Sequence, residues 1–139
     1  MNEEINLENL EKSLKTLIEG FEEFAKTPES KIKILLEDGC IQRFEYVLDI
    51  AWKTMKKLLK VQYGKSEEEL TVNNIFRLME GFGFINNWED WKDYYKKRNE
   101  SAHEYNIEKS RAIISLIPKF INDANLLLGN LKIELENSK

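Results

Sequence analysis

Cysteine, histidine and proline are scarce in this sequence of 139 residues, and each shortage excludes a class of protein. The one cysteine, Cys40, cannot form a disulfide within the chain, which excludes a disulfide-stabilised scaffold. One cysteine and one histidine cannot supply the three or four ligands of an ordinary zinc site, so we expect neither a metal nor a cofactor. Two prolines and six glycines leave long stretches uninterrupted, and the alternation typical of strands is absent. We therefore predict an all-α fold.

Long apolar runs, an export signal and an excess of positive charge are also absent. No stretch of about 18 apolar residues is present, so we predict no membrane span. The start of the chain is acidic and alternates leucines with charges, unlike an export signal, and we expect a cytoplasmic protein. Lys and Arg total 21 against 25 Asp and Glu, a net charge of −4, so any contact with RNA must be local. The length predicts one domain over residues 1–139.

Apolar residues at helical spacing predict two long helices in the first half of the chain. Residues 7–24 carry leucines and phenylalanines at alternating spacings of three and four, and this helix should end near Thr27 and Pro28. After a connector of about ten residues, a second helix is expected from about Asp38, with Gly64 as its cap.

The second half of the chain predicts a short helix and two longer ones. Thr71 caps the short helix, over residues 71–81, and Asn86 or Asn87 caps the next. The last helix starts from a cap at Asn106, and Pro118 should kink it or split it in two. Together these helices predict an antiparallel four-helix bundle with an additional short helix.

Two rows of side chains allow a structural and a functional interpretation. Trp88, Trp91 and Tyr95 lie at i, i+3 and i+7 and could stack on bases, but such rows usually belong to a core or an interface. Four lysines on one side of the second helix could line a nucleic-acid groove, although a solvated helix face is the simpler expectation. They are Lys53, Lys56, Lys57 and Lys60.

Acid–base chemistry in this chain has to use its one histidine, His103, or carboxylates. Just upstream, three lysines accompany Arg98, whose planar guanidinium suits a phosphate; they are Lys92, Lys96 and Lys97. On an ideal helix Arg98 and His103 are about 140° apart, on either side of the aromatic row. They can grip one phosphate only if the helix unwinds at Ser101–Ala102 or if a second chain contributes. A twofold dimer along the aromatic row would pair two histidines, one to accept a proton and one to return it, so we predict a homodimer.

Three smaller features complete the candidates. Arg43 and Glu45 flank Phe44 and could reach this segment across the bundle, but ion pairing along one helix explains them equally well. The three glutamates of residues 67–69 indicate a solvated turn, and Cys40 is expected to be a small buried apolar residue.

Arg98, His103 and Tyr105 together match the R-x4-H-x-Y motif of HEPN domains, the helical partners of minimal (MNT) nucleotidyltransferases. The upstream stretches Gln-Arg-Phe-Glu (residues 42–45) and Ala-Trp-Lys (residues 51–53) also resemble the nucleotidyltransferase substrate-binding branch of that superfamily. The resemblance extends over most of the chain and implies a HEPN-like helical domain.

The resemblance further implies what the motif residues do. Arg98 and His103 would form the metal-independent ribonuclease pair of HEPN toxins, assisted by Asn99. In toxin–antitoxin pairs of this kind the MNT partner neutralises the toxin, and the motif tyrosine, here Tyr105, is an adenylylation target. The same resemblance also supports a non-catalytic subunit that presents substrate to the nucleotidyltransferase. In a further alternative, a protein–protein adaptor, Arg98 and His103 would be interface residues.

Overall fold

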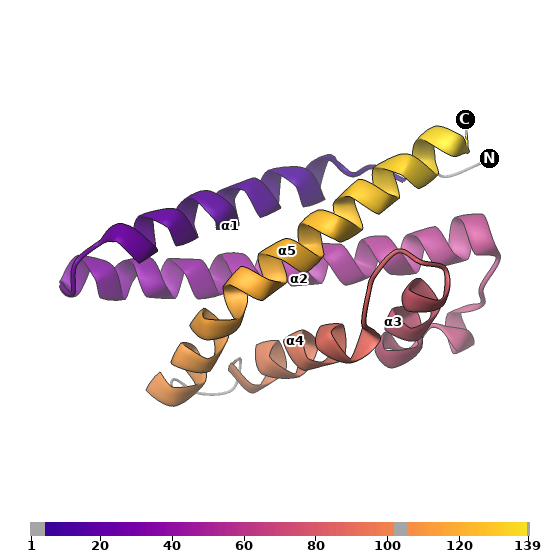
Figure 1. Ribbon diagram of the computed structural model, residues 1–139. Helices are drawn as coiled ribbons and strands as arrows, with labels where there is room; N and C mark the ends of the chain where they lie inside the picture. The colour runs from indigo at the N-terminus through magenta and orange to yellow at the C-terminus, as the bar shows by residue number, and fades with distance from the viewer. Residues whose placement is uncertain (1–4, 102–105, 139) are drawn as a thin grey trace.

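The computed structural model describes residues 5–101 and 106–138 of the chain (Figure 1). Over these ranges the chain forms five α-helices and a short 3₁₀ helix, with no strand. The helices are α1 (Glu8–Lys26), α2 (Lys31–Tyr63), α3 (Val72–Gly81), α4 (Trp88–Ser101) and α5 (Ile107–Asn137), and the 3₁₀ helix is η1 (Glu67–Glu69). The prediction of an all-α fold is confirmed.

The four long helices pack as a bundle, and α3 is an accessory to it. Figure 1 shows α1 and α2 as an antiparallel pair, with α5 crossing over both and α4 running along the other side of α2. The short α3 packs against α4 and α2. Lys132 of α5 pairs with Glu11 of α1 at 2.8 Å, which joins the end of the last helix to the start of the first. The predicted bundle with one additional short helix is confirmed.

The start of α2 differs from the prediction. The helix begins at Lys31 rather than about Asp38, because Ser30 accepts a hydrogen bond from the Lys33 amide at 3.1 Å and caps it. The expected connector of about ten residues is therefore wrong. The prediction followed the buried residues, and these begin only at Cys40; the earlier turns are helical but leave Ile32 and other apolar side chains exposed.

The other predicted helix ends are confirmed. Gly64 ends α2 with a φ of 65°, a left-handed conformation that glycine adopts without strain. Thr71 caps α3 by accepting from the Asn74 amide at 3.3 Å, and Asn106 caps α5 through the amides of its first turn. At the start of α4, the Asn87 side chain accepts from the Glu89 amide at 3.0 Å.

The sequence predicted that Pro118 kinks the last helix or splits it in two. Helix α5 continues through Pro118, so it is not split, and Figure 1 shows it bending along its length. By length and composition alone α5 passes the test for a membrane-crossing helix. Its buried side chains, Ile113 to Leu131, nevertheless pack into the core, as the central helix of a bundle requires. The absence of a membrane span stays a prediction.

Aromatic rings from three helices form the centre of the core. Phe120 of α5 contacts Phe44 of α2 with ring centroids 4.9 Å apart, and it contacts Trp91 and Tyr94 of α4 at 5.7 and 5.1 Å. Trp91 is fully buried, and Trp88 and Tyr95 are half-buried against the same core. The predicted aromatic row therefore takes part in the packing of one chain, and the dimer contact along it stays a prediction.

Candidate functional site

Arg98 lies in the last turn of α4 and reaches across to two carboxylates of α2. Its Nη1 donates to Glu45 Oε2 at 2.9 Å, and its Nε and Nη2 lie 3.4 and 3.3 Å from the two oxygens of Asp49. The side chains of Arg98, Glu45 and Asp49 are 26%, 22% and 32% exposed. The guanidinium is thus fixed on two sides at the surface of the bundle.

The two carboxylates determine the electrostatics of this cluster. The hydrogen bond that Arg98 donates to Asp49 is the largest of the effects that raise the pKa of Arg98, so the guanidinium is charged at any physiological pH. Two carboxylates against one guanidinium leave the three groups with a net charge of −1. The arrangement fixes the position of Arg98 but offsets its charge.

The local sequence explains how α2 provides both partners. Glu45 and Asp49 are four residues apart, so they lie on the same face of α2. Of the two alternatives for Glu45 and Arg43, the contact across the bundle is the one that Glu45 makes, whereas Arg43 lies beside Gly20 of α1. Asp49 was not among the predicted site residues, although its i+4 spacing from Glu45 pointed to it.

Contacts between α4 and α5 set the position of the helix that carries Arg98. The hydroxyl of Tyr94 donates a short hydrogen bond to Asp123 of α5, and burial, with this bond, raises the pKa of Tyr94. Lys119 of α5 pairs with Asp90 of α4 at 2.8 Å. Together with the buried Trp91, these contacts fix α4 along its length, so that its last turn faces α2.

The lysines upstream of Arg98 do not gather around it. Lys92 lies over the ring of Trp88, 5.5 Å from its centroid, and Lys97 pairs with Asp93 on its own helix at 3.5 Å. The side chain of Lys96 is not among the partners of the Arg98 carboxylates. The predicted basic cluster is therefore dispersed around α4, and Arg98 alone turns toward α2.

The remaining predicted site residues follow Arg98 in the chain. Asn99 lies next to it on α4 and is exposed. His103 and Tyr105 lie outside the described residues, so their predicted roles stay predictions. In the described ranges, no group of three or more His, Cys, Asp or Glu side chains is placed to hold a metal ion.

Comparison with known proteins identifies relatives of the whole bundle. The model of the family described as "nucleotidyltransferase substrate binding protein like" matches residues 5–133. A Haemophilus influenzae protein named probable ribonuclease HepT is 30% identical over 96 residues, which make up 68% of this chain. The match spans 66% of that protein, just under two thirds of its length.

Two solved structures share the fold. One is from Haemophilus influenzae and is described as the fold of a substrate-binding domain of a nucleotidyltransferase; it is 27% identical, with a TM-score of 0.82 over 91% of this chain and 99% of that one. A Thermus thermophilus protein is 27% identical, with a TM-score of 0.74 over 88% and 98% of the two chains. Since the family model covers nearly all of the sequence, this chain belongs to the nucleotidyltransferase substrate-binding family, as its HEPN-like motif predicted.

Proposed function

We propose that this chain is the RNA-cleaving partner of an MNT-type nucleotidyltransferase and that it cleaves without a metal ion. The observation that carries the proposal is the position of Arg98, which Glu45 and Asp49 fix at the end of α4, five residues before His103. The match to a protein named as a probable ribonuclease supports the activity. The family and the described nucleotidyltransferase domain support the partner.

In the proposed reaction the 2′-oxygen of the RNA attacks the neighbouring phosphorus, and the bond to the 5′-oxygen breaks. The guanidinium of Arg98 binds the phosphate and stabilises the negative charge that develops on it. His103 accepts the proton of the 2′-hydroxyl or donates one to the leaving 5′-oxygen. Asn99, exposed next to Arg98, offers an amide that can donate to the same phosphate.

The charge of the cluster also favours a second candidate function. A phosphate has to displace a carboxylate from Arg98, and the contacts to Asp49 are the longer ones, at 3.3 and 3.4 Å. If the carboxylates are not displaced, Arg98 ties α4 to α2 and has a structural role. The chain would then be a non-catalytic subunit that presents substrate to the nucleotidyltransferase, or a protein–protein adaptor.

Cleavage of RNA in the presence of EDTA separates the two functions. Wild-type protein should cleave, and Arg98→Ala and His103→Ala should each abolish cleavage, while Arg111→Ala, an exposed arginine of α5, serves as the matched control. Cleavage that is lost with EDTA, or that survives both substitutions, would reject the assignment. Inactivity of the wild type on all RNAs would favour the non-catalytic subunit.

A homodimer is the second part of the proposal. The single histidine of each chain favours it, because two chains are needed to provide both an acid and a base. An exposed apolar face of α2 also favours the dimer. It consists of Ile32, Leu35 and Tyr46, which are 64%, 70% and 62% exposed. These three residues lie within about 60° of each other around α2. Light scattering should return the mass of two chains at micromolar concentration, and Leu35→Glu should shift it toward one. The mass of one chain at every concentration would contradict the dimer.

Adenylylation of Tyr105 is the third part, as in toxin–antitoxin pairs. An added AMP carries a phosphate that would compete with RNA for Arg98, so the modification would neutralise the toxin. After incubation with the partner and ATP, the wild type should gain the mass of AMP and Tyr105→Phe should not. Tyr63→Phe, which removes a half-buried tyrosine at the end of α2 outside the proposed dimer face, is the control. Full modification of Tyr105→Phe would reject this site.

A further inference from the structure

A row of lysines on α2 lines an open hollow next to the Arg98 cluster. The hollow has a volume of about 570 Å³. It is lined by Trp52, Lys53, Lys56, Lys57, Lys60 and Val61. The chain as a whole carries a net charge of −4, so this concentration of positive charge is local.

The lysines form an extended row along one side of the helix. At about 100° per residue, Lys53, Lys56 and Lys60 lie within about 60° of each other around α2, and they extend over about 10 Å along its axis. Such a row is longer than one phosphate group, and its length suits a nucleic-acid strand, which carries one phosphate per nucleotide. In the part of the chain that the structure describes, neither Lys53 nor Lys57 forms an ion pair.

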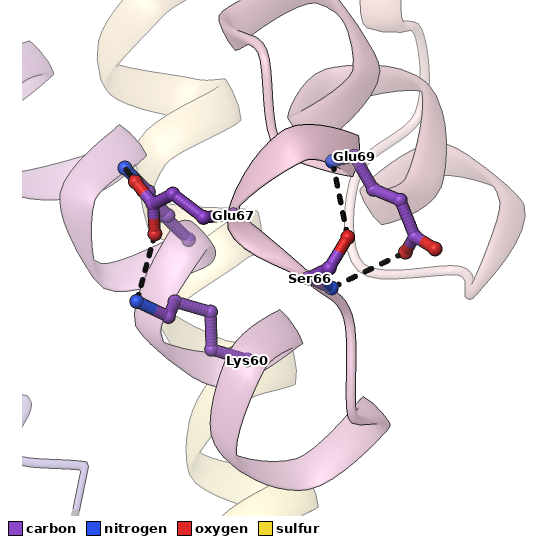
Figure 2. Close-up of polar contacts among 5 residues, drawn as sticks. Lys60, Ser66, Glu67 and Glu69 are labelled. Carbon is purple, nitrogen blue, oxygen red and sulfur yellow. Dashed lines mark hydrogen bonds and ion pairs between the residues drawn. The ribbon is translucent and has the colours of Figure 1, made fainter.

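A carboxylate of the chain already occupies the other two lysines. The oxygens of Glu67 pair with the Nζ atoms of Lys56 and Lys60 at 2.5 and 2.8 Å. Figure 2 shows Glu67 against Lys60, together with the reciprocal hydrogen bonds of Ser66 and Glu69 that shape η1. The hydrogen bonds from the two lysines lower the pKa of Glu67 to about 2. This end of the row therefore binds an oxyanion within the chain itself.

The hollow adjoins the Arg98 cluster through two aromatic rings. Trp52 packs edge-on against Tyr95 of α4, with ring centroids 6.1 Å apart, and Tyr95 lies three residues before Arg98. On α2, Trp52 follows Asp49 by three residues. A strand held by Arg98 would therefore continue onto the lysine row without leaving this side of the molecule.

We propose that the hollow between Lys53 and Val61 binds the phosphate backbone of single-stranded RNA next to the cleavage site. This inference rests on the proposed function, since RNA is the substrate there. Trp52 is half-buried. Its Nε1 is buried and has no hydrogen-bond partner among the described residues. The exposed part of Trp52 therefore offers ring carbons that can contact a base, and no hydrogen-bond donor. Binding by this surface should consequently depend little on base sequence.

The test measures binding separately from cleavage. Fluorescence anisotropy with a labelled 2′-O-methyl oligoribonucleotide is suitable because this RNA lacks the attacking hydroxyl. The double variant Lys53→Ala/Lys57→Ala should raise Kd by about tenfold at roughly 0.1 M salt, and the slope of log Kd against log salt should fall by about 0.7 for each lysine. The double variant Lys15→Ala/Lys31→Ala removes the same charge from exposed sites outside the hollow and should bind as the wild type does.

A second pair of variants tests whether removing a negative charge beside the lysine row strengthens RNA binding. Glu67→Gln removes the carboxylate that competes for Lys56 and Lys60, so it should lower Kd severalfold. Glu68→Gln changes the net charge equally from the next position of η1 and should have a smaller effect, because Glu68 pairs with neither lysine.

Each outcome separates this inference from the proposed function. An unchanged Kd in Lys53→Ala/Lys57→Ala, in protein that still cleaves RNA, would overturn the hollow as an RNA site and leave the ribonuclease proposal standing. Lysine-dependent binding by a protein that cleaves no RNA would support the hollow as an RNA site and would reject the ribonuclease proposal. If a poly-glutamate peptide of equal charge bound as tightly and with the same lysine dependence, the hollow would be a site for acidic protein segments, and the inference would be wrong.

Discussion

Two charged stretches follow each other on α2, and they differ in the sign of their net charge and in how far their charged groups are paired. Glu45 and Asp49 hold a single guanidinium between them, with a net charge of −1. One to three turns further along, four lysines face one carboxylate, Glu67, with a net charge of +3. The first stretch pairs groups of two helices at short range, whereas the second leaves charge exposed.

The first stretch is suited to fixing the position of one side chain, and the second is suited to attracting an anion. A guanidinium that is offset by two carboxylates attracts a distant anion poorly, but it holds its place, which a reaction at one phosphorus atom requires. Exposed lysines hold no fixed geometry, yet they attract a polyanion over about a Debye length. We therefore expect substitutions in the first stretch to affect stability and reaction rate, and substitutions in the second to affect mainly binding, with only small effects on stability.

The largest expected effect on stability is that of Arg98→Ala. The variant leaves Glu45 and Asp49 facing each other without their common partner, so the free energy of unfolding should fall by about 1–2 kcal/mol. Urea unfolding followed by circular dichroism measures it, with Arg111→Ala as the control. Equal stabilities of the two variants would show that the cluster does not tie α4 to α2.

The next effect is that of Asp49→Asn on the cleavage rate. The amide cannot provide two acceptor oxygens to Arg98, so the guanidinium loses its fixed orientation and kcat should fall about tenfold. KM should not rise, because the phosphate then competes with a weaker partner for Arg98. Asp38→Asn, a position on the same helix outside the cluster, is the matched control. A rise in KM at constant kcat would instead place Asp49 in substrate binding.

A smaller effect is expected for the lysine row. Lys53→Ala/Lys57→Ala should change the free energy of unfolding by less than about 0.5 kcal/mol, because neither side chain forms an ion pair among the described residues. Urea unfolding tests this in parallel with Arg98→Ala. A loss as large as that of Arg98→Ala would mean that the lysine row contributes as much to stability as the Arg98 cluster does.

The smallest effect concerns the pH dependence of the contact between Glu67 and its two lysines. The pKa of Glu67 is lowered from 4.5 to about 2, so the contact stabilises the fold above pH 4.5, and its contribution is lost as the pH falls toward 2. The small difference in Tm between wild type and Glu67→Gln should be constant above about pH 5 and should shrink below pH 4.5. A difference that vanishes already near about pH 6 would contradict the contact.

The elements that the sequence predicted well are those with local causes. Thr71, Gly64 and Asn106 set helix ends through their own backbone neighbours, and each was predicted from residue type alone. The start of α2 was missed because its first turns are helical without being buried, so the core pattern does not reveal them. The aromatic row was predicted, but Tyr94, outside it, is buried as well, because α5 packs against α4 on that side.

The candidate site depended more on contacts that are distant in sequence. Arg98 was found through its motif, and the reach of Glu45 was anticipated, whereas the contact to Asp49 spans 49 positions and appears only when α4 lies along α2. The lysines of α2 were expected to be a solvated face. Their place beside Trp52 and the Arg98 cluster follows from the packing of Trp52 on Tyr95, which helical spacing alone does not give.

Chemical rescue of Arg98→Ala tests the central claim, that the guanidinium of Arg98 acts on the RNA phosphate, most directly. In EDTA, wild-type protein should cleave RNA, and Arg98→Ala should be slower by at least about 100-fold. Guanidinium ion at millimolar concentration should restore part of the lost rate in Arg98→Ala, while equal concentrations of sodium or ammonium should not. Cleavage by Arg98→Ala at the wild-type rate without guanidinium would contradict the account.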